Sequence, residues 1–370
     1  MTKRVFFLMG VAIFSVVIHQ ATSWGYTAMM WWTDRYRPVT VPNFDQVGTL
    51  PYYVTMAIRQ LTVFCVPAFV FVTGFFLVYA ARGSQATLSW KMVRTRVVNL
   101  AIPYLIWSVV IWVADAFQGK VHAPVEYLRL FVTVGADAGY YFVPLLCQLY
   151  LISPLLAPIA KNQGRWLLVV TALLQASIIG LLYLTVFLKE SAPVVEVLRS
   201  ATTHYICFRW LFFFSLGMVS GTHLQELGQW LARLKRVLPM AVVVLGVLGI
   251  VETELVFHLI GADWRGNPHL ISTNLYSIAC ILCFLAFEEI RIPFPEFVNQ
   301  LASRSYGIYL LHGKVMEFFS RVIRQVAPWM LARQALFQPV LSVFGLAIPL
   351  LFMAVVARFL ARRLYAVLFS

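Results

Sequence analysis

A histidine closes the first long apolar run of the chain. The stretch VAIFSVVIHQATSWGY covers Val11–Tyr26, and His19 lies where its apolar residues give way to polar ones. With an unperturbed pKa of about 6.5, an imidazole at this position can accept a proton near neutral pH, which is the chemistry of a general base. The alternative is an interfacial histidine hydrated by lipid headgroups, and this stretch alone favours neither.

Other ionisable residues also interrupt apolar runs, among them Arg59, Arg209, Glu252 and Glu254. An ionisable side chain inside hydrocarbon must pair or line a hydrated cavity, and it is a candidate for function by default. If the N-terminus lies in the cytoplasm, these four residues and His19 share one level in the outer half of the membrane. We therefore predict one polar cavity that opens outward. Buried ion pairs that only fix helix packing are the alternative. Further positions of this kind are His204, His258, His312, Lys314 and Glu317.

A cluster of cations precedes the third apolar run. The stretch WKMVRTRVVNLAIPYLIW places Lys91, Arg94 and Arg96 at the mouth of that segment. Fixed cations suit phosphate groups, because a guanidinium binds them through two hydrogen bonds at once. Taken alone, the cluster is better explained as basic residues that hold a loop on the cytoplasmic side, with no ligand.

The composition is that of a polytopic membrane protein. Of 370 residues, 61% are hydrophobic and 12% charged, and the mean hydropathy is +0.80. Soluble chains are about 45–50% apolar and about a quarter charged. The net charge of +14 comes from basic residues in short connections, which predicts contact with membrane lipids and no binding of nucleic acid. No polar segment is long enough for a soluble domain, so we predict a single membrane domain over 1–370.

The elements that must position these residues are membrane helices. A spanning helix needs about 20 mostly apolar residues, and this rule predicts an all-α chain with about ten spans. Pro67 is predicted to kink the second span, and 124–134 to form a short interfacial helix. The predicted spans are 5–23, 53–80, 97–117, 139–159, 166–188, 204–222, 238–258, 270–288, 304–323 and 338–360.

The basic residues predict the orientation. With both termini in the cytoplasm, the connections on that side carry more lysine and arginine than the outer ones. The basic N-terminus lacks a clear cleavage site for a signal peptase, so we expect a retained first helix. The longest outer connection, 24–52, carries Trp31, Trp32 and Tyr36, which form either an interfacial aromatic belt or a sugar-stacking surface. The belt is the favoured interpretation.

The cysteines do not predict a metal site. Cys280 and Cys283 form a CxxC pair, but no second pair with metal-ligand spacing accompanies it. All five cysteines lie in apolar runs, where packing is the expected role: Cys65, Cys147, Cys207, Cys280 and Cys283. We expect no metal.

Several motifs, in order, resemble the membrane acyltransferase-3 family. The first helix ends in His19, and the other motifs are VPAFVFVTGFFL, RTRVVNLAIPY, YYFVPLLCQLYLISPLL, FFFSLGMVSG and SYGIYLLHGKV. Within the family, the segment Ile58–Leu77 looks closest to members that act on poly-N-acetylglucosamine, which have been viewed both as exporters and as O-acyltransferases. Two positions depart from the family pattern. Leu8 stands where the family has an arginine, and Asn99 ends the usual Arg-x-x-Arg motif.

The resemblance implies an O-acyltransferase in the inner membrane of a bacterium. Acetyl-CoA or succinyl-CoA would be the co-substrate, with its phosphates on Arg94 and Arg96 and Lys91 behind them. The acyl-pantetheine arm would run toward His19, the general base. Glu252 or Glu254 would orient the imidazole, and Arg59 or Arg209 would stabilise the oxyanion. The acceptor would be a polysaccharide or a lipid-linked glycan, supplied by polysaccharide synthase machinery.

Two other functions stay open on the sequence. An exporter of a polysaccharide needs a hydrated path with polar and aromatic lining, but no base aligned with a thioester. A membrane sensor or scaffold needs no chemistry at all. The outer polar residues and the inner basic mouth suit the two ends of a donor tunnel better than a wide polymer channel.

Overall fold

A computed structural model of the chain contains only helices, turns and loops in the residues that it describes. These residues are 1–30, 32, 48–81, 88–133, 135–187, 206–260, 270–359 and 362–369. Trp31, Tyr36 and His204, which the sequence analysis singled out, lie outside them. The internal contacts divide the chain into two units, and each is described by itself. The first unit is Met1–Ala68 with Trp230–Phe352, and the second is Phe69–Gln229 with Met353–Ser370.

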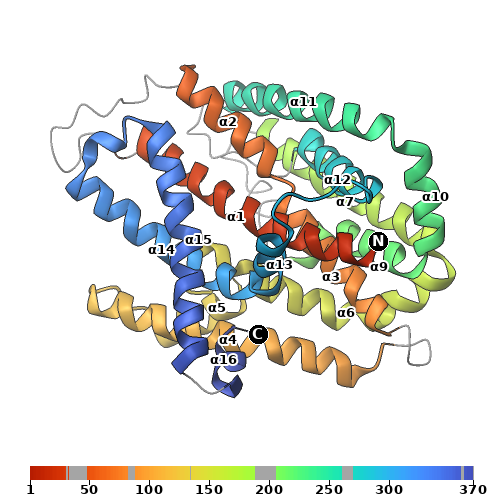
Figure 1. Cartoon of the computed structure of the whole chain (residues 1–370), viewed down its shortest axis with the longest axis horizontal. Coiled ribbons are helices and arrows are strands. Elements are labelled where there is room, and N and C mark those ends of the chain that lie inside the picture. The colour runs from red at the N-terminus through yellow and green to blue at the C-terminus, as the bar shows by residue number, and fades with distance from the viewer. Residues whose placement is uncertain are drawn as a thin grey trace. The chain divides into compact units, whose positions relative to one another are not determined.

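The first unit is built around the N-terminal helix, α1 (Thr2–Met30). This helix contacts α2, α12, α13 and α14, while α11 packs on α2 and α12 (Figure 1). The bounds of these helices are α2 Leu50–Thr62, α11 Val237–Ile260, α12 Ile271–Ala286, α13 Pro295–Ser303 and α14 Ser305–Val326, followed by the 3₁₀ turn η4 Pro328–Met330 and by α15 Gln334–Phe359.

The start of α1 is fixed by a buried arginine. Arg4 is 8% exposed, and it donates hydrogen bonds of 2.9 Å to the carbonyl oxygens of Phe284 and Ile290. The last carbonyls of a helix have no partner within that helix, so Arg4 satisfies the C-terminal end of α12 at Phe284, and at Ile290 it binds the connection that follows. The position at which the family carries an arginine, Leu8, is fully buried in the apolar core. Arg4 therefore has a structural role.

The predicted kink in the second span is confirmed. α2 ends at Thr62 and α3 (Cys65–Ala81) begins three residues later. Pro67 has no N–H to donate, and its ring crowds the carbonyl four residues earlier, that of Val63. The backbone therefore breaks between the two helices, and Arg59 and Thr62 lie in the last turn of the first one.

The second unit contains the remaining helices. Their bounds are α4 Trp90–Phe117, α5 Pro124–Val132, η2 Ala138–Tyr141, α6 Phe142–Asn162, α7 Gly164–Phe187, η3 Cys207–Trp210, α9 Leu211–Thr222 and α16 Arg362–Phe369. α5 matches the short helix predicted over 124–134. α10 (Leu224–Leu234), like α3 and α15, has residues in both units.

Two of the sequence motifs meet in the second unit through glycines. A Cβ added at Gly74 on α3 would overlap the carbonyl oxygen of Phe214 on α9, and one at Gly217 would overlap that of Phe71. The backbones of α3 and α9 are thus in direct contact, as small residues permit in membrane helix pairs. The stretches FVTGFFL and FFFSLGMVSG pack together because their glycines leave room.

Seven helical segments among the described residues are long and apolar enough to cross a membrane. They are Thr2–Met29, Leu50–Ala81, Trp90–Phe117, Gly139–Asn162, Gly164–Leu184, Val237–Leu259 and Gln334–Phe359. The chain is therefore an all-α polytopic membrane protein, and seven of the ten predicted spans have a counterpart. The other three fall on α9, α12 and α14. The first two are short, and α14 carries Lys314, Glu317 and Arg321, so the total of about ten stays a prediction.

Candidate functional site

His19 lies on α1 and faces the last turn of α2. Its side chain is half-buried, and its Nδ1 atom is 3.1 Å from the hydroxyl oxygen of Thr62. That hydroxyl lies 2.9 Å from the carbonyl oxygen of Ile58 and 3.1 Å from that of Arg59. Carbonyl oxygens only accept, so we assign the single hydroxyl hydrogen to the backbone, and with this assignment the Thr62 oxygen accepts from His19. The proton of the neutral ring is then on Nδ1, and Nε2 carries the lone pair that a general base needs.

Arg59 contacts the same turn of α1. Its guanidinium donates to the Ser23 hydroxyl at 2.8 Å and lies 3.4 Å from that of Thr22. The Thr22 hydroxyl in turn donates to the carbonyl oxygen of His19 at 2.7 Å. Arg59 also lies within electrostatic range of the imidazole. The structure thus brings together two of the predicted site residues, a base and a cation, across the contact between α1 and α2.

The hydroxyl residues of this cluster were not among the predicted site residues. Thr22 and Ser23 follow His19 by three and four positions, and Thr62 follows Arg59 by three. On a helix such spacings place the side chains on one face. This pattern of hydroxyls near a histidine and an arginine is the signal that would have found them.

Glu252 and Glu254 hydrogen bond with groups other than His19. Glu254 on α11 accepts from the Tyr52 hydroxyl at 3.1 Å, and its other oxygen is 3.4 Å from Nε2 of His258. Glu252 accepts from the backbone N–H of Ser272 at 2.9 Å and from the hydroxyl of the same residue. Two positions along a helix turn the side chain by about 200°, so the two carboxylates face different neighbours.

Thr62 therefore occupies the place beside the imidazole where a carboxylate was expected. Within the described residues no Asp or Glu bonds to the imidazole of His19. Glu254 stays close to the cluster through aromatic residues, since Tyr26 lies within electrostatic range of both Arg59 and Glu254. The ring of Tyr26 also packs edge-on against that of Tyr52, with 6.0 Å between the centroids.

The next candidate base, His312, is buried on α14. Its Nδ1 atom lies 2.8 Å from the carbonyl oxygen of Tyr309 and 3.1 Å from that of Ile308. Its neighbours on the helix pair with each other, because Glu317 bonds both Lys314 and Arg321. For Lys314 and Glu317 the structure thus agrees with the alternative of ion pairs between neighbouring side chains. The described residues hold no group of three or more His, Cys, Asp or Glu side chains that would bind a metal ion.

The remaining predicted site residues belong to the second unit. Arg209 lies in η3, is 6% exposed, and is within electrostatic range of Tyr141. Lys91, Arg94 and Arg96 are exposed on the first two turns of α4, whose N-terminus is capped by the Ser89 side chain.

The three cations of α4 do not share one face of the helix. Arg94 and Arg96 are two positions apart, which places them about 200° apart around the axis. Lys91 and Arg94, three positions apart, are neighbours. Arg96 lies within electrostatic range of Tyr150 on α6. Arg96 is thus an exposed cation of this cluster that lies within reach of α6.

A family model for an acyltransferase domain matches residues 7–358. The chain belongs to the acyltransferase-3 family. The match covers His19, Arg59, the cations of α4 and both glutamates, while Arg4 lies outside it. Members of this family are acyltransferases that transfer groups other than amino-acyl groups, so the chain is a membrane enzyme of that kind. Comparisons with curated proteins and with solved structures find no match.

Proposed function

We propose that this acyltransferase transfers an acyl group from acyl-CoA to a hydroxyl of a cell-envelope polysaccharide or its lipid-linked precursor. The observation that carries the proposal is the 3.1 Å contact between His19 Nδ1 and the Thr62 hydroxyl, because the direction assigned to it leaves Nε2 as the basic atom. Acetyl-CoA and succinyl-CoA are the proposed donors, and the inner membrane of a bacterium is the proposed location. The likeness of Ile58–Leu77 to members that act on poly-N-acetylglucosamine makes that polymer the first acceptor to test.

In the proposed mechanism His19 works as a general base. Nε2 takes the proton of the sugar hydroxyl as that oxygen attacks the thioester carbonyl of the donor. The tetrahedral oxyanion then collapses, the carbon–sulfur bond breaks, and the CoA thiolate leaves with the proton that His19 returns. The products are an O-acyl ester and free CoA, and the imidazole is neutral again.

Arg59 is the residue best placed to stabilise the oxyanion. Its guanidinium is held by Ser23 on α1, on the same turn as the carbonyl group of His19. A cation fixed beside the base before reaction stabilises negative charge without reorganisation. Arg96, with Lys91 and Arg94, is proposed to bind the phosphates of the donor.

The experiment compares purified wild-type protein with His19→Gln. Free CoA and acylated glycan are measured on equal amounts of folded protein, with acetyl-CoA or succinyl-CoA and fragments of poly-N-acetylglucosamine. Glutamine keeps polarity and approximate size, so folding and donor binding should persist while transfer falls by about 10²–10⁴-fold. His122→Gln, an exposed histidine of the second unit, is the control and should keep wild-type activity.

Two results would contradict the proposal. If His19→Gln retains more than about a tenth of wild-type transfer, His19 is not the base. His312 would then be tested next. Absence of CoA release by the wild type with either donor, together with movement of glycan across vesicles, would favour an exporter.

A further inference from the structure

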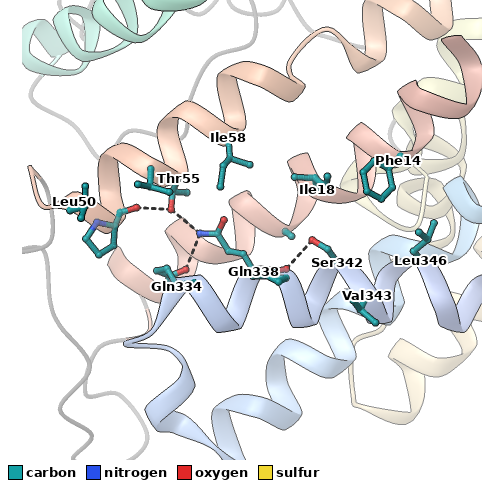
Figure 2. A pocket seen from close by; sticks show the side chains of 15 residues that line it. Phe14, Ile18, Leu50, Thr55, Ile58, Gln334, Gln338, Ser342, Val343 and Leu346 are labelled. Atoms are coloured by element: carbon teal, nitrogen blue, oxygen red, sulfur yellow. Dashed lines mark hydrogen bonds between the residues drawn. The ribbon is translucent and has the colours of Figure 1, made fainter. Parts of the chain in front are cut away.

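The first unit carries a groove that the candidate site does not use. Its volume is about 590 Å³, within the usual range for ligand pockets, and it is lined by α1, α2 and the first half of α15 (Figure 2). The ionisable residues of the candidate site do not line it. Most of its walls are apolar, from Phe14, Ile18, Val54, Ile58, Val343 and Leu346.

The groove has the length of one lipid leaflet. On α15 its lining runs from Gln334 to Leu346, which is about 18 Å at 1.5 Å per residue. The hydrocarbon core of a bilayer is about 30 Å thick, so one leaflet is about 15 Å. All three lining segments belong to candidate spans, and α2 and α15 both begin at the same end of the groove. A volume of about 590 Å³ spread over this length suits a single hydrocarbon chain.

Near the end of the groove where α15 begins, Gln338 and Thr55 donate a series of hydrogen bonds whose direction can be assigned. Gln338 donates from Nε2 to the Thr55 hydroxyl at 2.8 Å and to the Gln334 side-chain oxygen at 3.0 Å. Thr55 passes its own hydrogen to the carbonyl oxygen of Pro51 at 2.8 Å. Both partners of Gln338 must therefore accept, which fixes its amide with the NH₂ group toward them and the oxygen turned away.

The side-chain oxygen of Gln338 is the unusual feature of this groove. The residue is 6% exposed, and within the described residues no group donates to that oxygen. Figure 2 shows it on the side of Ile58, away from Gln334. An acceptor in apolar surroundings costs free energy until a donor reaches it. A hydrocarbon chain alone supplies no donor, so the fitting ligand carries one near its polar end.

We propose that this groove binds one membrane lipid with a single hydrocarbon chain along α15 and an N–H or O–H group that donates to Gln338. Gln338 lies four residues inside the start of α15, about 6 Å along the helix, where the polar end of such a lipid meets its tail. The site therefore prefers amide-linked or hydroxylated lipids to fully esterified ones. This inference does not depend on the acyl-transfer proposal.

Photolabelling of the purified full chain tests the site. Two diazirine probes with the same long chain are compared, an N-acyl ethanolamide, which has N–H and O–H donors, and a methyl ester, which has none. Peptides from α1, α2 and the first half of α15 should carry the label. The ethanolamide should label them about 2–10-fold more strongly than the ester, as expected for one hydrogen bond.

Variants separate the tail from the hydrogen bond. Gln338→Met should abolish the preference for the ethanolamide and keep labelling by both probes. Ser342→Phe fills the groove and should reduce both at least tenfold, whereas Leu351→Phe, on the exposed side of α15 outside the groove, should not. Two results with the wild-type chain would overturn the proposal, even if Ser342→Phe fails to fold. One is labelling of peptides other than these, and the other is a dimer in which the groove is protected from both probes. Equal labelling by the two probes would overturn the assigned role of Gln338.

Discussion

At the scale of single residues, the hydrogen-bond partner of the proposed base decides what that base can do. A carboxylate beside an imidazole both fixes the tautomer and stabilises the charged ring, whereas the hydroxyl of Thr62 fixes the tautomer only. The imidazole of His19 therefore has a neutral hydrogen-bond partner, and the cation of Arg59 lies within electrostatic range of it. This arrangement suits a base that must begin each cycle neutral.

The orienting role of Thr62 predicts a specific pair of variants. Thr62→Val keeps the shape of the side chain but removes the acceptor of His19 Nδ1–H. The ring is then free to turn or to change tautomer, and kcat should fall by about 10–10²-fold with the KM for acyl-CoA unchanged. Thr62→Ser should restore most of the activity, because it keeps the hydroxyl. Steady-state kinetics of both variants check this, and equal loss in Val and Ser would reduce Thr62 to a packing residue.

At the scale of elements, apolar runs predicted helices well and contacts poorly. Hydrocarbon thickness fixes the length of a span, so seven predicted spans follow from the sequence. The break before Pro67 also follows from the sequence, because proline has no N–H to donate. Depth along a helix predicted His19 and Arg59 at one level, and the structure brings these two residues close together. The direction of each side chain around the helix axis could not be predicted from the sequence. Glu252 and Glu254 were predicted at the same level, but they face Ser272 and Tyr52, and only helix packing determines this.

The contact between α3 and α9 predicts that a larger side chain at Gly217 strongly lowers stability. Gly217→Val would push side-chain atoms into the Phe71 carbonyl, and neither backbone can yield easily. Overpacking of this kind costs about 1–3 kcal/mol, so we expect a lower melting temperature in detergent. Gly180→Val on α7 is the matched control, since nothing lies within 4 Å of the added Cβ. Equal melting temperatures for the two variants would show that α3 and α9 are not closely packed.

The geometry of α4 predicts unequal roles for its cations. If Arg96 binds a donor phosphate, Arg96→Ala should weaken acyl-CoA binding by about 1.5–3 kcal/mol, the range for hydrogen bonds to charged groups. Arg94, on the opposite side of the helix, should matter less. Titration calorimetry in detergent measures both variants. Unchanged affinity for acyl-CoA in Arg96→Ala would mean that the cluster binds no donor and only holds its loop on the cytoplasmic side.

At the scale of the whole molecule, the number of crossings decides where the termini lie. Seven crossings would place them on opposite sides of the membrane, whereas the distribution of basic residues predicts both in the cytoplasm. One or all three of α9, α12 and α14 must then cross as well. α9 is the most informative of the three, because Arg233, Lys235 and Arg236 follow it. If α9 did not cross, these cations would lie outside.

Cysteine labelling in intact cells tests this prediction. The five native cysteines are replaced, and single cysteines are introduced at three exposed positions: Gln229 within α10, and Ser303 and Val326 at the last residues of α13 and α14. If all three helices cross, an impermeant maleimide should label Val326→Cys and spare the other two until the membrane is permeabilised. If none crosses, Gln229→Cys should be labelled instead and Val326→Cys spared. That second pattern would put the C-terminus outside and contradict the orientation on which cytoplasmic entry of the donor at Arg96 depends.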